Sequence, residues 1–150
     1  MYGWLLLLHI LGATVWTGGH LVLATTVLPQ VLRERSPQRL LDFELRFERI
    51  GMPALIVQVI TGVLLAQRLL PTFSHWLDFT NPVTHVVMSK LGLLTLTVLF
   101  ALHAKWRVLP HLRQGSADKL VVMAWHIVPV TLFSVLFVVA GVSFRTGWFY

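Results

Sequence analysis

The stretch MYGWLLLLHILGATVWTGGHLVLATTVLPQVL, Met1–Leu32, contains no Asp, Glu, Lys or Arg, and it decides the fold class. A helix needs about 20 mostly apolar residues to cross the hydrocarbon core of a bilayer. Three further apolar runs follow at residues 51–66, 82–104 and 120–144, of which only the second contains a charged residue, Lys90. Because a segment in lipid must satisfy its own backbone hydrogen bonds, we expect all four runs to be helices.

We therefore predict an all-α protein, an integral-membrane four-helix bundle that forms a single transmembrane domain over residues 1–150. The expected spans are approximately 4–29, 51–69, 83–104 and 120–143. The composition agrees, because 56% of the residues are hydrophobic and 12% are charged, against about 25% charged in soluble domains. The absence of cysteine excludes disulfides, iron–sulfur clusters, zinc–thiolate sites and covalently attached c-type haem.

The net charge of +6 would suggest nucleic acid in a soluble protein, but here the basic residues gather in two loops. Short loops rich in Lys and Arg stay in the cytoplasm. We therefore predict a multi-pass protein of a bacterial-type inner (cytoplasmic) membrane, with both termini outside, the basic loops cytoplasmic and no nucleic-acid partner. The loop residues are Arg33, Arg35, Arg39, Arg46 and Arg49 in the first loop, and Lys105, Arg107, Arg113 and Lys119 in the third.

The first loop is expected to contain structure. Ser36-Pro37 is typical of a helix N-cap followed by a proline in the first turn. Asp42 and Arg46 have the four-residue spacing of a supportive helical pair. We predict a short interfacial helix between the first and second spans, running into the second span with Pro53 near the join.

Ionisable side chains inside membrane spans are costly, so each needs a partner or a function. Histidines dominate this set, and acidic residues are missing from all four spans. His9 and His20 are 11 residues apart in the sequence, which places them about 20° apart on one helix face that Trp16 shares. The candidates are His9 and His85 toward the outside, and His20, His103 and His126 toward the cytoplasm.

Imidazoles on facing helices of a membrane bundle are the arrangement that b-type haem requires, with two of them as axial ligands. We therefore expect an integral-membrane protein that binds one or two haem b groups and acts in electron transfer or oxidoreduction. His103 or His126 would pair with His20, and His85 with His9. Lys90 is either a snorkelling side chain or the cation for a haem propionate or a quinone oxygen.

Two other functions remain open. The same histidines, His9, His20, His103 and His126, are also suited to copper, in a copper-binding, copper-transport or copper-resistance membrane protein. Alternatively, the chain is an accessory subunit whose histidines only pack. If the protein is an enzyme, we expect a haem-dependent membrane oxidoreductase, with a quinone or a redox protein as partner. A homodimer is compatible with so small a unit.

Several short motifs resemble the CopD-type copper-resistance membrane proteins. Trp16-Thr17-Gly18-Gly19 resembles the Trp-x-Gly-Gly of their first helix, and Arg46-Phe47 resembles the segment that leads into their next helix. Thr61-Gly62 and Lys90-Leu91 follow in the same order. This resemblance covers residues 5–105 and implies a membrane protein that handles copper.

The same pattern is also similar to the HemJ-type protoporphyrinogen oxidases, which are small four-helix membrane haem proteins. His9, Trp16 and Lys90 stand where that family has its first-helix His, its Trp and its third-helix Lys. Gly51-Met52-Pro53-Ala54 is similar to its entry to the second helix. The chain departs from the family after Trp16, because no arginine occurs before Arg33.

Overall fold

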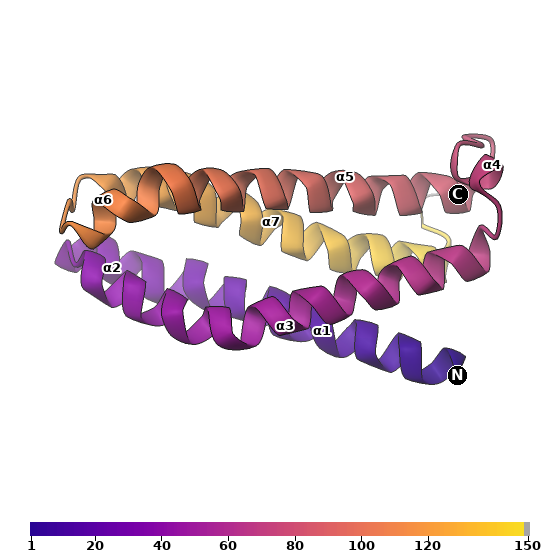
Figure 1. The fold of residues 1–150 in the computed structure, drawn as a ribbon, viewed down its shortest axis with the longest axis horizontal. Helices are drawn as coiled ribbons and strands as arrows, with labels where there is room; N and C mark the ends of the chain where they lie inside the picture. Colours follow the sequence, from indigo (N-terminus) through magenta and orange to yellow (C-terminus); the bar gives the residue numbers. More distant parts are fainter. Residues whose placement is uncertain (149–150) are drawn as a thin grey trace.

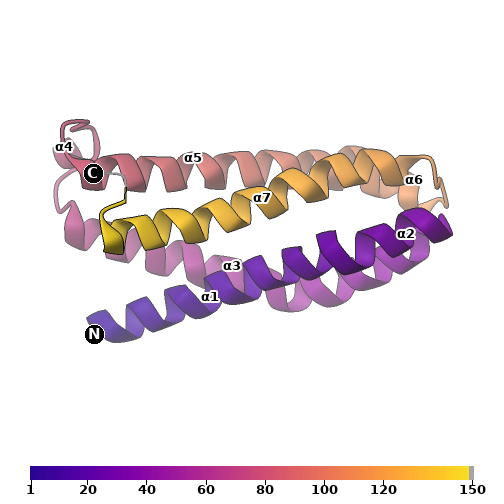
Figure 2. The same ribbon diagram turned by 180° about the vertical axis from the view of Figure 1, so that it is seen from behind.

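The structure is a computed structural model in which residues 1–148 are described, and within them the chain forms helices and no strands. Four long helical rods lie along one another, as the two opposite views show (Figures 1 and 2). The elements are α1 (Tyr2–Val22), η1 (Leu23–Val27), α2 (Leu28–Glu34), α3 (Pro37–Leu69), α4 (Phe73–Trp76), α5 (Pro82–His103), η2 (Ala104–Val108), α6 (Leu109–Arg113) and α7 (Lys119–Thr146).

Each rod is long and apolar enough to cross a membrane. The rods are Tyr2–Glu34, Pro37–Leu69, Pro82–Arg113 and Lys119–Thr146, with 33, 33, 32 and 28 residues. At 1.5 Å per residue the longest reach about 50 Å, which exceeds the hydrocarbon thickness of about 30 Å. The predicted all-α bundle with four membrane-crossing helices is confirmed, and the protein is a multi-pass membrane protein.

Two rods contain a π-helical turn, η1 and η2, just before a Leu-Pro pair. Pro29 and Pro110 lie in the first turn of the helices that follow, α2 and α6. A proline inside a helix removes a hydrogen bond and clashes with the preceding turn, and the extra residue of a π-turn relieves that clash. The first and third rods therefore continue to Glu34 and Arg113, beyond the ends expected for their spans.

The segment expected as a short interfacial helix is the first part of α3. Ser36 occupies the N-cap position and Pro37 the first turn, as predicted, although the Ser36 side chain makes no capping hydrogen bond. Pro53 lies inside α3 without ending it. Leu40 is fully buried because this part of α3 packs against the other rods.

The buried core lies at one end of the bundle. It gathers Leu23, Leu28, Val31, Leu40, Leu41, Ala104, Val108, Leu112, Leu120, Met123 and Ile127. Figure 1 shows α2 and α6 at this end, while both termini and α4 lie at the other. The two basic loops therefore share one end of the molecule, as the charge pattern predicted.

The helices pair as α1 with α3 and α5 with α7, and α1 also packs on α7. Hydroxyl groups link α1 to α7 in the buried interior. Thr17 Oγ1 donates to the carbonyl of Ser134 at 3.2 Å. Thr131 Oγ1 donates to the carbonyl of His20 at 3.3 Å. Such bonds satisfy polar groups that lipid cannot.

Candidate functional site

His9 is anchored between α1 and α3. Its Nδ1 lies 2.9 Å from the carbonyl oxygen of Gln58 and 3.2 Å from Thr61 Oγ1. A carbonyl oxygen only accepts, so Nδ1 carries the proton and Nε2 keeps its lone pair. Gly62 provides the space for the ring, because a Cβ there would lie 3.0 Å from His9 Cε1. The Thr61-Gly62 motif thus holds His9 in position, because Thr61 contacts its Nδ1 and Gly62 leaves space for its ring.

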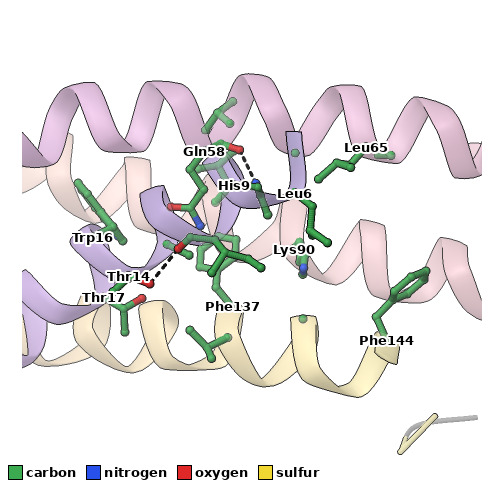
Figure 3. A pocket seen from close by; sticks show the side chains of 18 of the residues that line it. Leu6, His9, Thr14, Trp16, Thr17, Gln58, Leu65, Lys90, Phe137 and Phe144 are labelled. Carbon is green, nitrogen blue, oxygen red and sulfur yellow. Dashed lines mark hydrogen bonds between the residues drawn. The ribbon is translucent and has the colours of Figure 1, made fainter. Parts of the chain in front are cut away.

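A cavity of about 730 Å³ lies among the rods beside His9. Figure 3 shows His9 from α1, Gln58 from α3 and Lys90 from α5 reaching into it, with Phe137 from α7 on the opposite side. Of the residues predicted for a cofactor, His9, Trp16 and Lys90 line this cavity. His9 and Trp16 belong to the first predicted span and Lys90 to the third, and the structure places all three at one cavity.

His20 shares a face of α1 with His9, since both contact α3, but it belongs to a different environment. Its Nδ1 donates to the carbonyl of Trp16 at 2.9 Å. The imidazole packs against the rings of Trp16 and Phe47, with centroids 4.4 and 5.4 Å away. Aromatic rings thus surround His20, which is 8% exposed.

The other three histidines do not complete the expected pairs. His103 and His126 contact each other rather than His20. His85, expected to pair with His9, is exposed and lies 6.0 Å from the ring of Phe79. Within residues 1–148, His9 is the one histidine that lines the cavity. The described residues therefore offer a porphyrin no pair of axial imidazoles there, and the haem expectation has no support from this arrangement.

His103 on α5 and His126 on α7 form a facing pair. Their rings are nearly parallel, with an interplanar angle of 7° and centroids 4.9 Å apart. His126 Nδ1 donates to the carbonyl of Val122 at 2.8 Å, so its Nε2 has a free lone pair. His103 Nδ1 lies 2.7 Å from that Nε2 and donates to it. The π-turn η2 begins immediately after His103, and such turns are common at functional sites.

The two rings of this pair are not buried. His103 is exposed and His126 is partly exposed, and His103 is the last residue of α5, directly before η2. In the described part of the chain no group of three or more His, Cys, Asp or Glu side chains is placed to hold a metal. A tetrahedral zinc site needs four ligands, usually from the protein. Two imidazoles without further donors fit a metal that accepts low coordination.

Within residues 1–148, the structure shows a small four-helix membrane protein in which His103 and His126 face each other and a cavity lies among the rods beside His9. The family model for copper resistance protein D, CopD, matches residues 41–143, and the chain belongs to this family. The resemblance to the CopD-type proteins is thereby confirmed. Searches of curated proteins and of solved structures gave no significant match.

Proposed function

We propose that this protein is a copper-resistance membrane protein that binds Cu(I) between His103 and His126. The observation that carries the proposal is the 2.7 Å contact between the two ring nitrogens. Imidazole is a good ligand for copper, and Cu(I) accepts two nitrogen donors in a linear arrangement. Family membership supports copper as the substrate.

Copper binding requires one change of tautomer. The ion would take the place of the hydrogen bond between His103 Nδ1 and His126 Nε2, and the proton of His103 would move from Nδ1 to Nε2. Both rings stay neutral, so the site gains the single positive charge of Cu(I). Metal–imidazole bonds are about 2.0 Å long, so the two nitrogens must separate to about 4 Å. Because neither side chain is buried, few neighbouring atoms oppose this movement.

The backbone orients the second ligand. The carbonyl of Val122 accepts from His126 Nδ1 and so directs the lone pair of Nε2 toward α5. A metal-binding histidine usually has such a partner on its other ring nitrogen. Phe100 contacts the His126 ring at 5.8 Å and limits its rotation. Only His103 then needs to turn when copper binds.

We also propose on which side of the membrane the histidine pair lies. With the basic loops in the cytoplasm of a bacterial-type inner membrane, the histidine pair lies near the cytoplasmic boundary. Cu(I) is the form of copper that a reducing cytoplasm holds. The site would therefore receive or release the ion on that side.

The test measures Cu(I) affinity of the purified protein by competition with a coloured chelator under ascorbate. We expect one copper per chain in the wild type and strongly weakened binding in His103→Ala and in His126→Ala. His111→Ala is the matched control, because His111 is an exposed histidine at the same end whose Nδ1 contacts its own helix, at the carbonyl of Arg107. Unchanged affinity in the doubly substituted protein would refute the site. A Soret band with quantified iron would favour haem instead.

A further inference from the structure

The cavity beside His9 is separate from the proposed copper site. Tyr2 and Arg145, which lie near the two ends of the chain, contribute to its lining, whereas His103 and His126 do not. Its volume of about 730 Å³ is far larger than a few waters need, and falls in the range of ligand pockets. The walls come from α1, α3, α5 and α7.

The lining restricts the ligand to an apolar molecule with a polar head. Leucine, valine and aromatic side chains form most of the wall. The charged side chains that line it are Lys90 and Arg145, and no Asp or Glu lines it among the described residues. A metal cation would meet two positive charges without an anionic partner. The head group is therefore neutral or negative.

The polar atoms of the wall also require a hydrogen-bond donor from the ligand. Gln58 is 9% exposed, and its Oε1 is buried without a hydrogen-bond partner among residues 1–148. A buried acceptor left unpaired destabilises the protein. His9 Nε2 is a second acceptor, because Nδ1 holds the proton. Fatty-acid carboxylates and lipid esters cannot donate to either atom.

Lys90 supplies the complementary donor from another helix. Its Nζ lies beside Gly141 on α7, where a Cβ would be in ordinary contact with it at 3.5 Å. Figure 3 shows Lys90 reaching into the cavity from α5, across from Gln58 on α3. A ligand that satisfies both side chains needs a group that donates to Gln58 Oε1 and an oxygen that accepts from Lys90 Nζ.

We propose that this cavity binds a membrane quinol, the reduced form of a lipid-soluble quinone. One ring hydroxyl donates to Gln58 Oε1, and the oxygen on the opposite side of the ring accepts from Lys90 Nζ. Phe137 offers an aromatic face for the ring. The apolar tail lies along the leucine and valine side chains.

The experiment uses the purified, copper-free full chain, so its result is independent of the histidine pair. The probe is a decyl-substituted benzoquinol, titrated anaerobically by calorimetry. We expect saturable binding that weakens at least about tenfold in Gln58→Leu and in Lys90→Met, since each removes one polar partner. Thr95→Val is the matched control, because Thr95 is an exposed hydroxyl on α5 bonded to Leu91.

Two results would overturn the proposal. The first is wild-type affinity for the quinol in Gln58→Leu and Lys90→Met, both checked for helicity and a monodisperse elution profile. The second is oleate binding that displaces the quinol and is unaffected by Gln58→Leu, which would identify an acyl-chain site.

Discussion

The ring of Phe47 on α3 occupies the space that the missing side chain of Gly19 leaves on α1. A Cβ at Gly19 would overlap the Phe47 ring, and a Cβ at Gly51 would lie 2.9 Å from the same ring. Phe47 also contacts Trp16 and His20. The Trp-x-Gly-Gly and Arg-Phe motifs therefore meet at one helix contact.

This contact predicts different effects for two adjacent glycines. Gly19→Ala forces Phe47 out of its position, and overpacking of this kind costs about 1–3 kcal/mol of stability. Gly18→Ala places its Cβ in open space, and alanine favours a helix by about 0.5–1 kcal/mol over glycine. Thermal unfolding in detergent should show a lower midpoint for Gly19→Ala and an unchanged or higher one for Gly18→Ala. Equal midpoints would contradict the packing.

Copper affinity should fall as the pH is lowered. An imidazole binds metal only in its neutral form, so protons compete with the ion for any histidine ligand. Chelator competition at pH 7.5 and at pH 5.5 should give weaker binding at the lower pH, with the same profile in His111→Ala. Thioethers do not titrate, so pH-independent affinity would assign the ion to methionine side chains and not to the histidine pair.

Asp78, in the loop before α5, should keep its charge into acid. The hydroxyl of Thr80 donates to its Oδ1 at 2.6 Å and the backbone N–H of Thr80 at 3.0 Å, and these bonds lower the pKa of the Asp78 carboxyl. A lowered folded-state pKa means that this stabilisation of the loop is present above the unfolded pKa and is lost as the pH falls through the folded one.

Carboxyl NMR titration can test this hydrogen bond. Thr80→Ala should raise the pKa of Asp78 toward its ordinary value, because it removes the hydroxyl donor. Thr80→Ser keeps a hydroxyl and should leave the pKa nearly unchanged. A pKa that is the same in all three proteins would rule out the hydroxyl as the cause.

The rods could be predicted from the sequence, because a charge-free run such as Met1–Leu32 has few stable alternatives in lipid. The pairing of His103 with His126 could not. The pairing depends on how α5 and α7 are rotated and shifted relative to each other. The periodicity of a single helix does not predict its rotation or shift relative to another helix. The role of Gly62 was partly visible in the Thr61-Gly62 motif, but only the structure shows that His9 fills the space beside it.

The π-turns mark a second limit of sequence reasoning. Pro29 and Pro110 were the available signals for η1 and η2. Proline usually bends or ends a helix, and whether a π-turn absorbs it depends on packing.

The last prediction concerns the orientation of the protein in the membrane. The two basic loops lie at the same end of the bundle, so both must lie on the same side of the membrane, and a single reporter decides which side that is. We expect alkaline phosphatase fused after Thr146 to be active, and the same enzyme inserted at Gly115 to be inactive. Changing Arg33, Arg35 and Arg39 to Gln should increase the inverted fraction, because these charges retain the loop in the cytoplasm.

Arg68→Gln provides the matched control for these changes. Arg68 is an exposed basic residue near the opposite end of α3. Arg68 lies at the end of α3 that is predicted to face outside, so its positive charge opposes the predicted orientation. Removing this charge should leave the native topology unchanged or more uniform. If Arg68→Gln inverted the protein instead, Arg68 would be the cytoplasmic charge. His103 and His126 would then face the outside, where the proposed copper site would meet the ion before it crosses the membrane.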